Sequence, residues 1–202
     1  MTEAGERVVY KPVAGIEPLW DFAAPSLVTR EVWTYRIDQT LGTGVVPETA
    51  YGTGIYGPGA VQRFVEALAD SAVVEMVNRA DVRLWPIALL DLVTNNADRK
   101  AGHILRNDGD RLWAIDHGLT FHSEPKLRTI LWGLAGQPIP NDLLLGLHRL
   151  RDAIDGELGS AFESELSGDE RSALIDRVER LLDDKIHPQP PEHRPAIPWP
   201  PY

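Results

Sequence analysis

Two carboxylates, a lysine and a histidine lie at spacings that suit the transfer of a phosphoryl group. Asp98, Lys100 and His103 share one polar segment, and Asp116 ends an apolar run further along the chain. Phosphoryl transfer needs a carboxylate that orients the attacking hydroxyl, a second carboxylate that holds a metal ion, and a cation beside the transferred group. We expect Asp98 to orient the acceptor hydroxyl and Lys100 to lie beside the γ-phosphate. Asp116 and His103 are then the expected metal ligands.

The segments around these residues predict how they meet. Residues 82–93 are apolar on nearly every side, which is typical of a helix in the centre of a domain. Residues 103–106 and 111–115 are two short apolar runs joined by an Asp-Gly turn, a strong hairpin signal. Folding this hairpin back brings Asp116 beside the polar segment 94–100. We therefore expect both carboxylates in one cleft.

Other segments are assigned from periodicity and turn residues. Residues 27–41 are expected to form a helix that Ser26 caps, and 60–65 a strand. The glycine-rich residues 51–59 lack the Lys-Ser/Thr ending of a phosphate-binding loop and are expected to form a turn. Further helices are predicted over 125–134, over 141–158 and after the capping box that starts at Ser167.

The two reactive motifs resemble those of a known superfamily. Residues 95–103 read Asn-Asn-Ala-Asp-Arg-Lys-Ala-Gly-His, and residues 115–122 read Ile-Asp-His-Gly-Leu-Thr-Phe-His. Together they resemble the catalytic and metal-binding motifs of the phosphatidylinositol 3-/4-kinase-like superfamily, and are similar to a set of actinobacterial proteins of that type. The resemblance implies that Asp98 is the catalytic aspartate and Asp116 the metal-binding one. It also implies ATP and Mg²⁺ or Mn²⁺ as cofactors.

The same resemblance implies the rest of a nucleotide site. Lys11 matches the strand lysine that holds the ATP phosphates, and Glu31 matches its glutamate partner on the first helix. Phe64 and Val65 fall where the chain enters the hinge that binds adenine through its backbone. His103 stands where this superfamily usually has asparagine, so the preferred metal is left open between Mg²⁺ and Mn²⁺.

The expected fold class is α+β, and the resemblance implies the two lobes of a protein kinase. Residues 1–65 are expected to form a partial small β-lobe with one helix, and 66–187 a mainly helical catalytic lobe. Only ten residues precede Lys11, whereas two further strands and a phosphate-covering loop would need about 25. The β-lobe is therefore expected to be truncated.

The tail, 188–202, has seven prolines in fifteen residues. This composition favours a flexible terminus over a strap along the domain or a ligand for a partner's groove.

Composition excludes several classes of function. Among 202 residues, 20 Lys and Arg against 30 Asp and Glu leave a net charge of −10, which opposes nucleic-acid binding. The absence of cysteine excludes disulfides, thiolate metal sites and a thiol nucleophile. No apolar run is long enough for a transmembrane segment, and the first ten residues do not resemble a signal peptide. We therefore expect a cytoplasmic protein.

The sequence thus predicts an ATP-dependent phosphotransferase, a kinase of the phosphatidylinositol 3-/4-kinase-like type. Its acceptor is left open among a lipid headgroup, a protein and a small molecule. The truncated β-lobe favours the alternative of a catalytically inactive nucleotide-binding or scaffold module. A metal-dependent hydrolase with His103, Asp116 and His122 as ligands is disfavoured, because the histidines lack the close spacings of such sites. Taken singly, each of these residues is also compatible with a purely structural role, as a loop, surface or core side chain.

Overall fold

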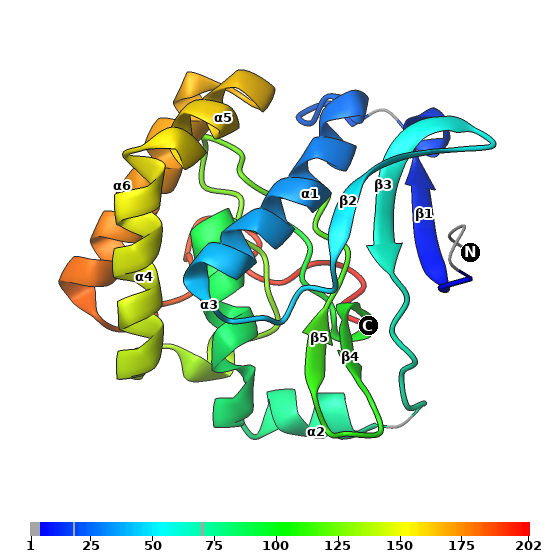
Figure 1. Ribbon diagram of the computed structural model, residues 1–202. Coiled ribbons are helices and arrows are strands. Elements are labelled where there is room, and N and C mark those ends of the chain that lie inside the picture. Colours follow the sequence, from blue (N-terminus) through cyan, green and yellow to red (C-terminus); the bar gives the residue numbers. More distant parts are fainter. Residues whose placement is uncertain (1–4, 18, 70) are drawn as a thin grey trace.

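The computed structural model describes residues 5–17, 19–69 and 71–202. A small antiparallel sheet with strand order β1-β3-β2 lies on one side of the molecule, and most of the helices lie on the other (Figure 1). The strands are β1 (Val8–Pro12), β2 (Thr49–Gly54) and β3 (Gly57–Arg63). The helices are α1 (Ala24–Leu41), α2 (Ala72–Asn78), α3 (Trp85–Thr94), α4 (Asn141–Ile154), α5 (Glu157–Glu165) and α6 (Gly168–Asp184). None of the helices in these residues is long and apolar enough to cross a membrane.

Helix α1 connects the sheet to the helical part. Its Val28 and Val32 pack against Ala60 of β3, while its Trp33 and Ile37 belong to the large core that continues through α3, α4 and α6. The helix begins earlier than expected, with Ala23 rather than Ser26 as its N-cap, since proline is tolerated in a first helical turn. It ends as expected at Gly42, whose positive φ of 76° suits glycine.

The predicted turn within the glycine-rich residues 51–59 is present at Ile55 and Tyr56, but it is shorter than expected, because the residues on either side of it belong to β2 and β3. A Cβ atom at Gly52 would lie 2.5 Å from a methyl carbon of Val61. One at Gly59 would lie 2.4 Å from the carbonyl oxygen of Lys11. These glycines therefore allow close packing within the sheet rather than a reversal of the chain.

The hairpin downstream of α3 was predicted correctly. Strands β4 (Ile104–Arg106) and β5 (Leu112–Ala114) pair antiparallel, with Leu105 opposite Trp113. The backbone amide of Ala114 donates to the carbonyl of Val45 at 2.8 Å, which joins this hairpin to the segment between α1 and β2.

Residues 125–134 do not form the predicted helix. The backbone amides of Lys126 and Leu127 donate to the side-chain oxygen of Asn95 at 2.9 and 2.8 Å. The amide of Arg128 donates to the carbonyl of Asn96 at 2.9 Å. Because these donors are bound to the loop after α3, the segment stays extended until the short 3₁₀ turn at Trp132–Leu134.

The proline-rich tail is a strap along the domain, and the interpretation of residues 188–202 as a flexible terminus was wrong. The carbonyl of Ala196 accepts hydrogen bonds from the amide of Thr129 at 3.0 Å and the indole of Trp132 at 2.8 Å. Further on, the carbonyl of Pro201 accepts from the amide of Ala101 at 3.0 Å. The strap therefore ends against the segment that contains Asp98.

His187 anchors the start of this strap and predicts a dependence of stability on pH. Its ring packs edgewise against Trp85 and Trp132, with ring centroids 5.8 and 5.6 Å apart. Burial lowers the pKa of His187, against the opposing effects of the Pro188 carbonyl and Asp91. The unfolded chain therefore binds a proton more readily below about pH 6.5, and stability is lost as the pH falls below that value.

We predict that the free energy of unfolding is lower at pH 5.5 than at pH 7.5, and that His187→Gln reduces this difference. Urea denaturation at both pH values measures it. His148→Gln, which changes an exposed histidine of α4, is the control and should keep the parent's pH dependence. An unchanged pH dependence in His187→Gln would contradict the prediction.

Candidate active site

The structure brings Lys11, Glu31 and Asp116 together from three separate elements. The Nζ of Lys11 on β1 lies 2.5 Å from Oε1 of Glu31 on α1 and 3.2 Å from Oδ1 of Asp116, just after β5. Glu31 is almost completely buried, whereas the Asp116 side chain is half exposed. The pairing of Lys11 with Glu31 that the sequence suggested is therefore present, and a second carboxylate joins it.

The charges of these three groups support one another. Burial alone would lower the pKa of Lys11, but Glu31 and Asp116 outweigh it and raise the pKa. Burial would raise the pKa of Asp116, but Lys11 and His103 outweigh it and lower the pKa. At neutral pH the site therefore contains a charged lysine beside an ionised aspartate.

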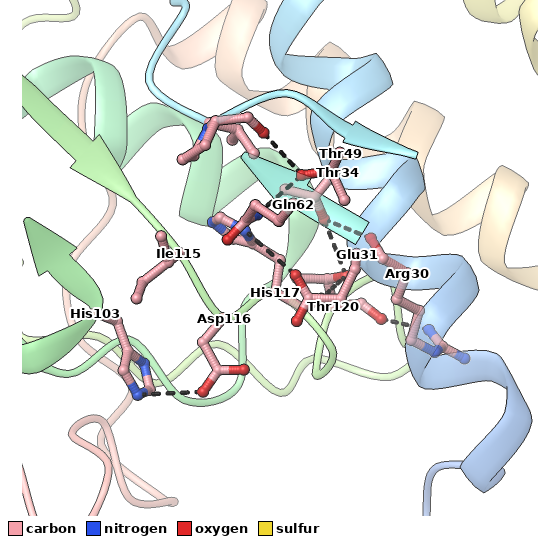
Figure 2. A network of polar contacts seen from close by, with 12 residues as sticks. Arg30, Glu31, Thr34, Thr49, Gln62, His103, Ile115, Asp116, His117 and Thr120 are labelled. Carbon is pink, nitrogen blue, oxygen red and sulfur yellow. Dashed lines mark hydrogen bonds and ion pairs between the residues drawn. The ribbon is translucent and has the colours of Figure 1, made fainter. Parts of the chain in front are cut away.

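His103 lies on the other side of Asp116. Its Nε2 is 3.3 Å from Oδ2 of Asp116, a contact drawn in Figure 2. Burial lowers the pKa of His103, against the charges of Asp116 and Asp98, which favours the neutral imidazole. Its Nδ1 is buried and has no hydrogen-bond partner. Asp116 itself has a positive φ of 61°, so the chain turns sharply there and its carboxylate can face both Lys11 and His103.

Asp98 and Lys100 form a separate pair beside His103. Oδ2 of Asp98 lies 3.1 Å from Nζ of Lys100, and both side chains are partly exposed. The amide of Asp98 donates to the side-chain oxygen of Asn96 at 2.9 Å, and the amide of Ala97 donates to the carbonyl of Leu119. These bonds fix the backbone on which Asp98 is presented.

Arg99 and Asp91 are fully buried and form an ion pair that sequence reasoning missed. Nε of Arg99 donates to both carboxylate oxygens of Asp91 at 3.0 and 3.1 Å. Its Nη1 donates to the carbonyls of His103 and Ile115 at 3.2 and 2.9 Å. The pair thus connects α3 to both arms of the hairpin. A single aspartate inside the apolar residues 82–93 was the available signal.

Asn95 is a second residue that the prediction did not assign. It has a positive φ of 56° at the end of α3. Its side-chain amide donates to the carbonyls of His122 and Glu124 at 2.9 and 2.7 Å, while its side-chain oxygen accepts two backbone amides. Asn95 therefore holds the segment after Asp116 against the Asp98 loop.

His117 faces Glu31 in the interior of the site (Figure 2). Its Nδ1 lies 4.0 Å from Oε2 of Glu31, and neither atom has a hydrogen-bond partner. Complete burial lowers the pKa of His117 well below its ordinary value, so its ring is neutral. Two buried polar atoms that face each other across this gap are positioned to form a hydrogen bond after a small movement.

The remaining predicted residues lie apart from this cluster. Phe64 and Val65 follow β3 directly, in the irregular segment that leads from the sheet to α2. The amide of Phe64 donates to the carbonyl of Arg7 at 3.1 Å. His122 points elsewhere, because its ring packs on Phe22 with centroids 5.3 Å apart and its Nδ1 accepts the amide of Glu124. The proposed hydrolase ligands His103, Asp116 and His122 are therefore not brought together.

The fold is a kinase-like α+β fold. The chain resembles the crystal structure of the Helicobacter pylori proinflammatory kinase CtkA, with a TM-score of 0.51 and 15% identity, over 89% of this chain and 83% of that one. It is 36% identical to Protein Rv2133c of Mycobacterium tuberculosis over 227 aligned positions, which cover 95% of this chain and 81% of the relative. The chain belongs to the family of that mycobacterial protein. None of the protein-family profiles compared with it matches.

The buried ion pair predicts a large effect on stability. Arg99→Met leaves the Asp91 carboxylate buried without a counter-ion, and we expect it to lower the free energy of unfolding by about 3–5 kcal/mol. Urea denaturation measures the change. Arg83→Met is the control, because Arg83 forms its ion pairs with Asp81 and Asp110 at the surface, where such pairs contribute little. Equal destabilisation by the two substitutions would contradict the prediction.

Proposed function

We propose that this protein is an ATP-dependent phosphotransferase of the phosphatidylinositol 3-/4-kinase-like type. The observation that carries the proposal is the contact of Lys11 with both Glu31 and Asp116, with His103 on the far side of Asp116. In a kinase-like fold this is the arrangement expected for a lysine that holds nucleotide phosphates beside a metal-binding carboxylate.

Asp116 and His103 fit a divalent cation. One offers a half-exposed carboxylate and the other a neutral imidazole, and both face the same space. The imidazole nitrogen favours Mn²⁺ relative to Mg²⁺, which prefers oxygen. Bound there, the ion would offset negative charge on the nucleotide phosphates. No group of three or more ligating side chains occurs in the residues that the structure describes, so phosphate oxygens and water would supply the other ligands.

Asp98 and Lys100 are assigned to the reaction itself. Asp98 would accept the proton of the acceptor hydroxyl and hold that hydroxyl in line with the γ-phosphate. Lys100, now paired with Asp98 at 3.1 Å, would turn toward the transferred group as its charge develops. Phe64 and Val65 would hold adenine through their backbone. The acceptor stays open among a lipid headgroup, a protein and a small molecule.

One observation favours a catalytically inactive nucleotide-binding module as the second candidate. Within the described residues β1 is an edge strand of the sheet, so no strand there covers the outer side of Lys11. A kinase holds its nucleotide phosphates between the strand lysine and a covering loop. Without such a loop, nucleotide would bind weakly and turn over slowly.

The two carboxylates should affect binding and turnover differently. Asp116→Asn removes the charged metal ligand, and we expect it to abolish the rise in melting temperature that ATP with Mn²⁺ or Mg²⁺ causes. Asp98→Asn acts on the acceptor, so it should bind ATP as the parent does but lower transfer or slow ATP hydrolysis by about 10²–10⁴-fold.

Calorimetry with ATP and release of phosphate, measured on the same samples, separate these effects. Asp152→Asn, which changes an exposed aspartate of α4, is the control and should behave as the parent does. If Asp98→Asn loses ATP binding while Asp116→Asn keeps it, the assigned roles are wrong. If the parent binds ATP but transfers phosphate to no acceptor, the inactive module replaces the enzyme as the better interpretation.

A further inference from the structure

A pocket of about 400 Å³ lies between α6, residues 123–127 and the beginning of the strap. Its volume falls within the range of about 300–1,000 Å³ that is typical of small-molecule sites. Apolar side chains form much of its wall, among them Leu92, Leu127 and Leu181. Lys11, Asp98 and Asp116 do not line it, so it is separate from the candidate active site.

Arg177 of α6 contributes a buried cationic group to this pocket. Its Nε donates to the carbonyl of Val93 at 2.8 Å, while its Nη2 is buried and has no hydrogen-bond partner. No carboxylate among the described residues forms an ion pair with it. Burial, assisted by the charge of Arg180, lowers the pKa of Arg177 to about 9, against the opposing charges of Asp176 and Glu170. A buried guanidinium that forms no direct ion pair is unfavourable, and a bound anion would relieve that cost.

Two more arginines line the same pocket. Arg180 donates to the backbone carbonyl of Asp176 at 3.0 Å, and Arg194 of the strap donates to the carbonyl of Leu127 at 2.7 Å. Neither forms an ion pair within the described part of the chain. Asp176 and Asp184 also reach the wall, which leaves a net excess of one positive charge from three arginines and two aspartates. This balance suits a ligand with a single anionic group.

We propose that this pocket binds an amphipathic anion, in which one carboxylate or one phosphate monoester is joined to a short apolar chain. The anionic group pairs with the guanidinium of Arg177. The apolar chain packs on Leu92, Leu127 and Leu181. The ligand also contacts Asn95, the residue that begins the Asp98 loop and holds the segment after Asp116.

Calorimetry on the full chain without nucleotide tests this site, and its result does not depend on kinase activity. The probes are decanoate, decyl phosphate, decanol and inorganic phosphate. We expect saturable binding of at least one decyl anion, with decanol and inorganic phosphate each at least about tenfold weaker, because each lacks one of the two recognised parts. The comparison of decanoate with decyl phosphate identifies which anionic group is preferred.

Two variants test the location. Arg177→Met should weaken binding of the decyl anion by about 10- to 100-fold, the loss expected for a hydrogen bond between charged groups. Because Arg177 also holds the carbonyl of Val93, Ala173→Trp provides a second test that keeps the arginine and fills the pocket from α6; it should also abolish binding. Arg151→Met changes a partly exposed arginine of α4 and should leave the affinity unchanged.

Three results would overturn the proposal. The first is the absence of saturable binding for both decyl anions. The second is parent-like affinity in both Arg177→Met and Ala173→Trp. The third is equal affinity for decanol or inorganic phosphate, which would remove the need for one of the two recognised parts.

Discussion

The buried ion pair between Asp91 and Arg99 is the interaction on which the rest of the site depends. Two charges without access to water are costly unless they are paired and hydrogen-bonded. Asp91 accepts bonds from Arg99, Asn96 and Thr129, and the remaining bonds of Arg99 reach the carbonyls of His103 and Ile115. Satisfying this pair therefore fixes the loop that carries Asp98 and the strand end that carries Asp116 relative to α3.

Lys11 forms the second connection, between the small sheet and the helical part. It pairs with a buried glutamate of α1 and with the half-exposed Asp116. One lysine between two carboxylates connects β1, α1 and the end of the β4–β5 hairpin while leaving Asp116 half exposed to solvent. A metal ion on Asp116 and His103 would compete with Lys11 for the same carboxylate, which would free the ammonium group for phosphate. The proposed nucleotide binding thus requires Lys11 and Asp116 to exchange ion-pair partners, and it requires no further charged side chains.

The strap and the segment after Asp116 form hydrogen bonds to residues on either side of Asp98. Asn95 fixes residues 122–127, and the strap bonds to Thr129, Trp132 and Ala101. The pocket lined by Arg177 opens among these same segments. A ligand there would contact Asn95, at the start of the Asp98 loop, but not Lys11, Asp98 or Asp116, so the two proposed sites have no reactive residue in common.

The sequence by itself determined the β4–β5 hairpin and the grouping of Asp98, Lys100, His103 and Asp116, because these depend on short-range patterns. The kinase-like fold class rested on the resemblance of residues 95–103 and 115–122 to the motifs of a known superfamily. That resemblance also suggested the partnership of Lys11 with Glu31. Tertiary structure alone decided the extended course of residues 125–131 and the docking of the strap, since their backbone groups bond to partners distant in sequence. The same holds for the glycines of β2 and β3, whose role is close approach to another strand. Burial gives three charged residues their roles, namely Asp91, Arg99 and Arg177. The sequence does not reveal that burial, because it depends on how the whole chain folds.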